Sequence, residues 1–132
     1  MTRGGAQEPG RTRRRRGAYR LGLRAETLAA LYLRARGWRI LARRFRAGSG
    51  EIDIIARRGR TIAFIEVKAR GDRDAALTSI TPSAQRRIAS AARTWCAGRE
   101  DLGAMTLRFD AVLVSPWRLP VHIADAFAVA ER

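Results

Sequence analysis

The sequence predicts an α/β protein in which helices cover a mixed β-sheet. Apolar residues recur at helical spacing in two segments, and runs rich in isoleucine and valine lie between and after these segments. A chain of 132 residues is long enough for one domain with a sizeable core and too short for two such domains. We therefore expect a single sheet built in the order helix, three strands, helix, two strands.

The first half of the chain is expected to form one helix and three strands. Residues 18–36 carry an apolar stripe at helical spacing, and Gly37 is a suitable C-terminal stop. A turn is predicted at 47–50, where two glycines flank a serine. The three predicted strands are 38–45, 51–57 and 61–69.

The second half is expected to contribute one helix and two strands. Residues 70–80 have the pattern of a loop. Thr81 is a suitable N-cap for a helix that starts at Pro82 and runs to about Ala97. The two strands predicted after this helix are 107–114 and 121–129.

The strands 51–57 and 61–69 concentrate the acidic residues of the sheet. Because side chains alternate between the faces of a strand, Glu66 and Lys68 are expected on one face of the second strand. On the first strand the acids are expected on one face and the isoleucines on the other: Glu51 and Asp53 against Ile52 and Ile54.

The turn between these two strands decides which acids face each other. A type II′ turn at Gly59-Arg60 places Asp53 opposite Glu66. A turn centred on Arg58-Gly59 instead places Glu51 opposite Glu66. Directly opposed residues have Cβ atoms about 5 Å apart. Either two-residue turn therefore brings carboxylates and Lys68 onto one face, whereas a three-residue loop would disrupt this arrangement.

Carboxylates beside one ammonium group are suited to a hard divalent cation. Magnesium takes oxygen ligands and retains several waters, and such an ion can polarise a phosphoryl oxygen and help activate water. Lys68 is the only lysine in a chain with 27 basic residues. A lysine can lose its proton when buried, whereas an arginine stays charged. The sequence therefore predicts a Mg²⁺ or Mn²⁺ site in which Lys68 holds or activates water, although a lone lysine at a strand end also arises by chance.

The net charge of +15 favours a polyanionic partner such as nucleic acid. Residues 1–17 alone carry six arginines and one glutamate. We expect them to form a basic disordered arm before a domain at 18–132. Within the arm, the residues expected to contact phosphates are Arg13, Arg14, Arg15 and Arg16. A codon bias toward arginine explains part of the composition but not the net excess of positive charge.

Cysteine content and hydropathy indicate the cellular compartment in which the protein is expected. The single cysteine, Cys96, leaves no internal disulfide or multi-cysteine zinc site and fits a reducing cytoplasm. No apolar run is long enough to span a membrane, and no apolar segment of a signal peptide follows the basic N-terminus. We expect a cytoplasmic protein without a membrane partner.

The wider pattern resembles a known family, the YraN-like uncharacterised bacterial proteins, over most of the chain. The resemblance rests on GLRAETLAALYLRARGWRIL (22–41), GEIDIIA (50–56), FIEVKAR (64–70), TPSAQRRIASAARTW (81–95) and RFDAVLV (108–114). It implies a restriction-endonuclease-like fold, shared with PD-(D/E)XK nucleases and Holliday-junction resolvases. The implied activity is metal-dependent hydrolysis of DNA, including branched or structured DNA, and a resolvase-like enzyme is expected to form a homodimer.

The resemblance also implies roles for matching residues. Asp53 and Glu66 match the metal-ligating acids and Lys68 the catalytic lysine. Glu26 matches an acid that such folds often place on the first helix toward the metal. Glu51 lies in the same motif as Asp53 and is a further candidate ligand. Nucleic-acid contacts are expected from the motif's Arg70.

The second helix departs from the family pattern near its start. A lysine is common there, whereas this chain has Ala84, followed by Gln85 and Arg86 as substitutes for contacting a phosphate. This departure supports an alternative, a nucleic-acid-binding module of the same fold without turnover. A third hypothesis is a basic assembly factor that docks on RNA or on an acidic protein.

Several other residues are open to two interpretations. Asp110 is expected to be structural, through an ion pair with Arg108 or a loop contact, and the single histidine, His122, is more typical of core or surface packing than of catalysis. Tryptophans can stack on bases but more often pack in the core or at its rim. The three in this chain are Trp38, Trp95 and Trp117.

Overall fold

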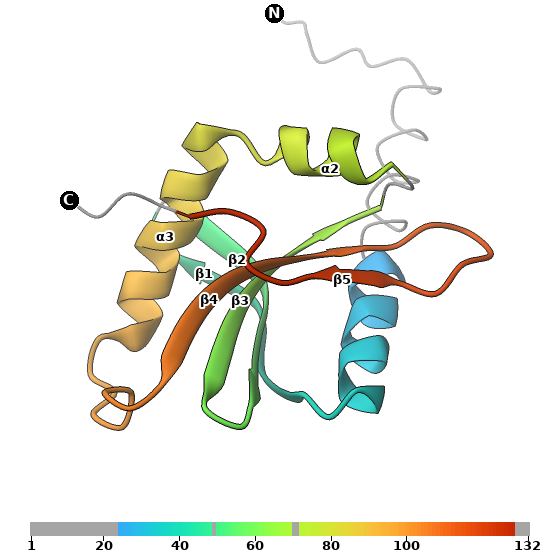
Figure 1. Ribbon diagram of the computed structural model, residues 1–132. Helices are drawn as coiled ribbons and strands as arrows, with labels where there is room; N and C mark the ends of the chain where they lie inside the picture. Colours follow the sequence, from blue (N-terminus) through green and yellow to red (C-terminus); the bar gives the residue numbers. More distant parts are fainter. Residues whose placement is uncertain (1–23, 49, 70–71, 129–132) are drawn as a thin grey trace, which may run out of the picture.

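A computed structural model describes residues 24–48, 50–69 and 72–128 as a five-stranded mixed sheet with three helices (Figure 1). The strands are β1 (Arg39–Ala47), β2 (Gly50–Arg58), β3 (Thr61–Lys68), β4 (Thr106–Leu113) and β5 (Val121–Ile123). They lie in the order β1-β2-β3-β4-β5, with β3 and β4 parallel and every other neighbouring pair antiparallel. The predicted α/β class with a mixed sheet is confirmed.

The first helix is described over residues 24–35, and the predicted start at 18 lies outside the described residues. Its end confirms the predicted glycine stop. Gly37 has a φ of 91°, and its N–H donates to the Arg34 carbonyl at 3.0 Å while the Trp38 N–H donates to the Leu33 carbonyl at 2.9 Å. This pair of bonds is the Schellman motif, which satisfies carbonyls at a helix end and needs a left-handed residue.

The helix α3 (Pro82–Cys96) begins as predicted. The Thr81 hydroxyl accepts a hydrogen bond from the Ala84 N–H at 3.1 Å, and Pro82 occupies the first helical position. Its buried residues Ile88 and Trp95 pack against one face of the sheet. On the opposite face the first helix buries a stripe of small and apolar residues: Ala25, Ala29, Ala30 and Leu33. The sheet therefore lies between two separate cores (Figure 1).

The prediction of a loop over 70–80 was wrong, because α2 (Arg73–Ser79) forms there. The Asp72 side chain accepts a hydrogen bond from the Asp74 N–H at 3.1 Å, and Ala76 is fully buried. A helix of seven residues makes about two turns, which is too short to establish an apolar period. Capping by Asp72 and contact with the sheet stabilise it instead.

The last predicted strand was too long. The ladder ends at Ile123 instead of 129, and residues 124–128 are not in a strand. Asp125 has a φ of 55°, and its N–H donates to the Asp110 carboxylate at 2.9 Å. The Ala126 N–H donates to the Phe109 carbonyl at 2.7 Å. Alanine and aspartate, which are depleted in strands, make up most of 124–128, and these tertiary hydrogen bonds hold the segment outside the ladder.

Strict alternation of faces along β2 was also wrong. Ile52 belongs to the core under α3, whereas Ile54 belongs to the core under the first helix. The change of face occurs at Asp53, and the flanking pairs of the β1–β2 register place Arg44 opposite it. Arg44 has a φ of 53°, which interrupts the extended conformation of β1. The candidate site is therefore built at an irregular point of the sheet.

Candidate functional site

The hairpin of β2 and β3 has the register that a Gly59-Arg60 turn predicts. Arg58 pairs with Thr61, and Gly59 has a φ of 60°, as the first central residue of a type II′ turn requires. The ladder extends to the pair Ile54 and Ile65, and continuing the same register by one residue places Asp53 opposite Glu66. The Val67 N–H donates to the Asp53 Oδ2 at 2.8 Å, which holds this carboxylate against β3.

The carboxyl groups of Asp53 and Glu66 form an electrostatically unfavourable pair. Burial raises the pKa of Asp53 to about 7, with further contributions from the negative charge of Glu66, a hydrogen bond with its carboxyl group and the charge of Glu51. The hydrogen bond from the Val67 N–H acts in the opposite direction. Near neutral pH this pair is therefore stabilised by a shared proton or by a cation.

Lys68 completes the cluster. Its Nζ lies 3.4 Å from the Glu66 Oε2, and both side chains are largely shielded from solvent. They point to the same face because they are two residues apart on β3. The structure thus brings Asp53, Glu66 and Lys68 together, as the sequence predicted, and the chain's one lysine is the cation beside the acidic pair.

A cavity of about 430 Å³ opens beside the two carboxylates. The lining residues come from β1, β2, β3, α3 and the turn between β1 and β2: Arg46, Gly48, Gly50, Glu51, Asp53, Glu66, Ala84, Arg87 and Ile88. Gly50 allows α3 to approach β2 this closely, because a Cβ at this position would overlap the Arg87 carbonyl oxygen. The glycine that precedes the acidic motif therefore has a packing role at the cavity.

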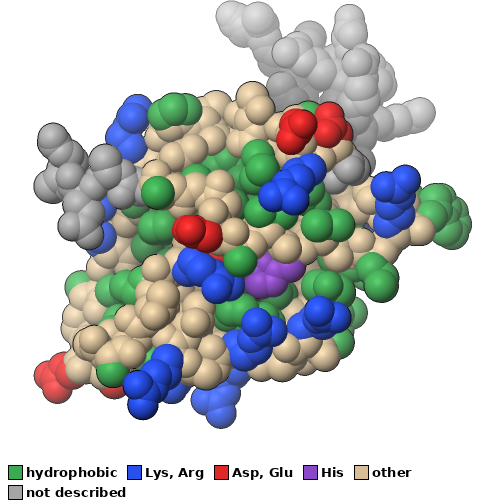
Figure 2. Space-filling model, viewed as in Figure 1, with side chains coloured by type: hydrophobic (Ala, Val, Ile, Leu, Met, Phe, Trp, Pro, Cys, Tyr) green, Lys and Arg blue, Asp and Glu red, His purple; other side chains and the backbone are tan. Residues whose placement is uncertain are grey.

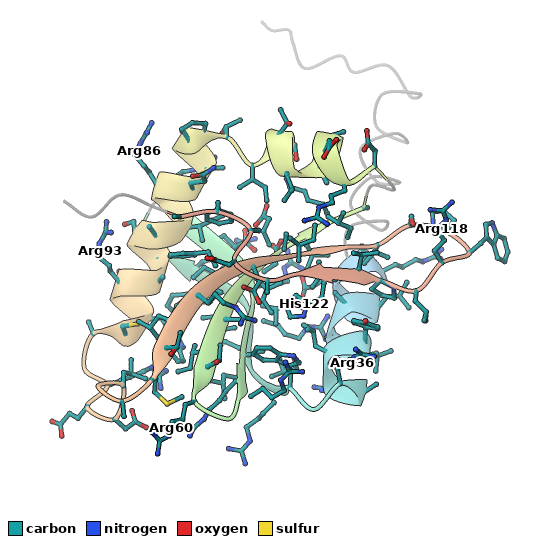
Figure 3. All side chains as sticks on the ribbon, viewed as in Figure 1. Arg36, Arg60, Arg86, Arg93, Arg118 and His122 are labelled. Carbon is teal, nitrogen blue, oxygen red and sulfur yellow. The ribbon has the colours of Figure 1, made fainter. Side chains whose placement is uncertain are left out.

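Two arginines line this cavity, Arg46 from β1 and Arg87 from α3, and the Arg87 Nη1 donates to the Ser83 Oγ at 2.7 Å. Sequence reasoning missed Arg87. It lies three residues after Ala84 and so on the same side of the helix, which was a usable signal. Of the predicted phosphate contacts on this helix, Gln85 donates its side-chain amide to the Ile80 carbonyl at 2.9 Å, and Arg86 points away from the sheet (Figure 3).

Glu51 lines the cavity but is also paired with arginine. Its carboxylate oxygens lie 3.8 Å from the Arg44 Nε and 3.6 Å from the Arg46 Nε. These are loose, partly exposed ion pairs that contribute little stability. Glu51 therefore remains available to a cation, and its role as a ligand stays a prediction.

Glu26 is buried on the first helix and does not line the cavity. The Arg43 Nε donates to its Oε2 at 2.8 Å, and the Arg44 Nε lies 3.9 Å from its Oε1. Buried charges need such partners. Arg44 also lies 3.8 Å from Glu51, and so links Glu26 to an acid that lines the cavity.

The described residues contain no group of three or more Asp, Glu, His or Cys side chains arranged to hold a metal ion. Mg²⁺ is nevertheless commonly held by one or two carboxylates with waters completing its shell. Asp53 and Glu66 are oxygen donors of this kind. Burial and, after it, the negative charge of Glu66 raise the pKa of Asp53, and a bound divalent cation would offset both effects. The donor set therefore fits a magnesium or manganese ion.

A buried polar cluster lies on the opposite face of the sheet, around the fully buried Asp110. Its carboxylate accepts two hydrogen bonds from Arg108, at 2.8 and 2.9 Å, and one from the Asp125 N–H. His122 Nε2 lies 2.7 Å from its Oδ2. The predicted Arg108 ion pair and loop contact are both present. The cluster joins β4, β5 and the following segment, which is a structural role.

The other predicted contacts are not described by the structure. Arg70 and the arm residues Arg13, Arg14, Arg15 and Arg16 lie outside the described residues. Their roles in binding nucleic acid stay predictions. Within 24–48, 50–69 and 72–128, no helix has both the length and the apolar character needed to cross a membrane.

Fold and site together define an α/β protein with a mixed five-stranded sheet and a cavity that holds two opposed carboxylates beside a lysine. The model of the uncharacterised protein family UPF0102 matches residues 25–114 of the chain. The chain belongs to this family, so the predicted YraN-like resemblance is confirmed.

Curated relatives agree with this assignment over nearly their whole length. The chain is similar to the UPF0102 protein of Rhodopseudomonas palustris (strain HaA2), with 54% identity over 110 residues that cover 83% of this chain and 86% of the relative. For the UPF0102 protein of Methylocella silvestris the identity is 57% over 112 residues, covering 85% and 90%. For UPF0102 protein bll0669 of Bradyrhizobium diazoefficiens it is 48% over 124 residues, covering 94% and 93%.

Proposed function

We propose that this protein is a divalent-metal-dependent nuclease that hydrolyses phosphodiester bonds in DNA, with branched or otherwise structured DNA among its substrates. The observation that carries the proposal is the approach of Asp53 to Glu66 with Lys68 beside them. We further propose that the fold is restriction-endonuclease-like. The strand order and the parallel pairing of β3 with β4 around this site support that proposal.

Each residue of the site has a task in this reaction. Asp53 and Glu66 would hold the cation, which when bound supplies polarisation of a phosphoryl oxygen and assistance in activating water. Lys68 orients the attacking water, because its compact ammonium group presents three donors on a flexible stem. Arg46 and Arg87, which line the cavity, would contact the phosphate groups of DNA bound there.

A cleavage assay tests this proposal. Purified protein would be incubated with end-labelled single-stranded, duplex, flap and four-way-junction DNA in the presence of Mg²⁺, Mn²⁺ or EDTA. The wild type is expected to cut in either metal and not in EDTA, and Asp53→Asn is expected to abolish cutting. Asp101→Asn, a change of the same kind at an exposed acid outside the cavity, serves as control. Absence of cutting by the wild type, or equal cutting by Asp53→Asn, would contradict the proposal.

A second candidate function is binding of nucleic acid without turnover. The observation that favours it is that Ala84 lines the cavity near the start of α3, where the family resemblance leads us to expect a lysine. This candidate predicts salt-sensitive DNA binding with no cleavage. Calorimetric titration with Mn²⁺ separates the two functions, because a nuclease site takes up the metal and a site that serves only as a scaffold does not.

A further inference from the structure

The hairpin that connects β4 to β5 begins at the end of the sheet where β3 finishes with Lys68. β4 ends at Leu113, directly beside Lys68 at the end of β3. The next residue, Val114, donates its N–H to the Lys68 carbonyl at 2.8 Å. Residues 115–120 then project beyond the sheet, at the right of Figure 1. The connection that carries the tip of this hairpin therefore begins beside Lys68.

The three tryptophans of the chain have different environments. Trp38 and Trp95 are core residues, with 3% and 6% of their surface exposed. Trp117, at the tip of the hairpin, is 101% exposed. A tryptophan has an apolar surface of about 150–250 Å² that is normally buried in a core or an interface. No packing within the described protein accounts for the indole of Trp117.

The backbone at Trp117 is also unfavourable for this residue. Residues 116–117 form a turn, and Trp117 has a φ of 65°. Proline followed by a residue with positive φ is typical of a type II turn, whose second central position favours glycine or asparagine. A large L-residue is strained in this region. A strained side chain that contributes no packing is more readily explained by function than by stability.

The surroundings of Trp117 combine apolar and positively charged side chains. Leu119 is 79% exposed and Arg118 is also exposed, and Pro116 and Pro120 restrict the backbone on either side. Figure 2 shows hydrophobic side chains at the outer end of the hairpin, and Figure 3 places Arg118 there. A rigid turn that presents an aromatic ring next to a guanidinium group matches the chemistry of a nucleotide, which offers a base face and a phosphate.

We propose that Trp117 stacks on an unpaired base of bound DNA while Arg118 contacts the adjacent phosphate. This inference rests on the proposed function, and it specifies that function by selecting DNA with unpaired or easily unstacked bases. The net charge of +15 favours DNA as the occupant over a second copy of this equally basic chain. Bases in a continuous duplex are stacked on each other, so only ends, single strands, flaps and junctions offer a free face.

The test measures binding separately from cleavage. Fluorescence anisotropy in EDTA would compare wild type, Trp117→Ala and Trp117→Phe on a labelled single strand, a four-way junction and a covalently closed duplex circle, which has neither ends nor unpaired bases. Trp117→Ala is expected to lose about tenfold or more in affinity for the single strand and the junction, with little change for the duplex. Trp117→Phe retains a ring and should keep most of the affinity. Leu31→Ala removes another exposed apolar side chain and should match the wild type.

Stability supplies a second measurement. Trp117→Gly is expected to raise the thermal midpoint, because glycine adopts positive φ without strain and no packing is lost, while single-strand affinity falls as in Trp117→Ala. Equal affinity of Trp117→Ala and wild type for every DNA would overturn the proposal. An equal loss of affinity by Trp117→Ala for all three DNA substrates would also overturn it. Sedimentation would compare the masses of the two proteins in solution. A smaller mass for Trp117→Ala than for the wild type would overturn the proposal and assign the hairpin to contact between copies of the chain.

The outcomes for Trp117 and for the nuclease proposal are distinguishable. If the wild type cleaves DNA and Trp117→Ala binds normally, the stacking proposal is wrong and the nuclease proposal stands. If the wild type does not cleave but Trp117→Ala loses affinity selectively for unpaired DNA, the stacking proposal stands and the nuclease proposal is wrong. Failure of the wild type to bind any DNA would overturn both.

Discussion

Asp53 is the residue at which stability and the proposed chemistry conflict. Its carboxyl group is buried beside Glu66, so its pKa is raised to about 7 from the ordinary value of 3.8. Because the folded state binds this proton more tightly than the unfolded state does, the contribution of Asp53 to folding becomes less favourable as pH rises from about 4 to about 7. Below that window the protonated group carries no such penalty.

We predict that Asp53→Asn raises the free energy of unfolding at about pH 8 and has a smaller effect at about pH 5. Asparagine stays neutral, can still accept from the Val67 N–H, and removes the repulsion with Glu66. Urea unfolding of both proteins at the two pH values, without added metal, measures the difference. The same shift at both pH values would show that Asp53 does not titrate in this range.

The pKa of Asp110 is shifted in the direction opposite to that of Asp53. Burial alone would raise its pKa, but hydrogen bonds from His122, Arg108 and the Asp125 N–H outweigh burial and lower it. The stability that Asp110 contributes is therefore present above its unfolded pKa of 3.8 and is lost as pH falls through the lower pKa of the folded state.

Asp110→Ala is predicted to reduce the free energy of unfolding by about 3–5 kcal/mol, because it leaves Arg108 without its carboxylate partner in a partly buried place. Thermal or urea unfolding at neutral pH measures this loss. Asp101→Ala, at an exposed acid, should stay within about 0.5 kcal/mol of the wild type. A similarly small effect at Asp110 would contradict its structural role.

The sequence predicts most of the candidate site at the level of single residues, and the reasons for its failures are physical. Asp53, Glu66 and Lys68 follow from strand alternation and one glycine turn, both of which are local rules. Arg87 depends on how closely α3 approaches β2, and the partner of Asp110 on β5 depends on the order of strands. Such contacts join segments far apart in the chain, and local periodicity carries no information about them.

Among the elements, the contact between β2 and α3 depends on Gly50. We predict that Gly50→Ala reduces the free energy of unfolding by about 1–3 kcal/mol, because the added methyl group meets helix backbone that cannot move freely. It should also reshape the cavity beside Asp53. Gly103→Ala is the matched control, since its Cβ would enter open space. Urea denaturation of both variants provides the comparison, and equal midpoints would contradict the close approach.

Elements were predictable where sequence signals were strong and local. The cap of α3 by Thr81 and the Gly59 turn follow from single residues with defined backbone preferences. α2 was missed because seven residues establish no period. The last strand was overextended because the residues after Ile123 are mostly alanine and aspartate, which are depleted in strands, and hydrogen bonds to β4 hold them outside the ladder. The change of face at Asp53 follows from the left-handed conformation of Arg44, which no residue preference indicates.

At the scale of the whole molecule, positive charge dominates the surface. Figure 2 shows Lys and Arg side chains distributed over one face around the single histidine. Neutralisation of phosphates releases counterions, so the affinity for duplex DNA should fall with a slope of about 0.9 per phosphate contact in a logarithmic plot against salt. Composition alone predicts a preference for polyanions, and the fold shows which arginines line the acidic cavity.

Arg87→Ala is predicted to reduce that salt slope by about 1, because it removes one phosphate contact at the cavity. Arg93→Ala removes an arginine from the outer side of the same helix, where it points away from the sheet (Figure 3), and should leave the slope unchanged. Anisotropy titrations over a range of salt concentrations, in EDTA, measure both slopes. Equal slopes for the two variants would mean that DNA does not enter the cavity beside Arg87.

The measurement that tests the central claim most directly is cleavage of DNA by Lys68→Arg beside the wild type. The substitution preserves the positive charge next to Glu66 but replaces the compact ammonium group with a planar guanidinium group that cannot act as a base. We predict metal-dependent cutting by the wild type and loss of cutting by Lys68→Arg, with DNA binding retained. Equal cutting by both proteins, or binding without cutting in either, would contradict the assignment of the lone lysine to catalysis.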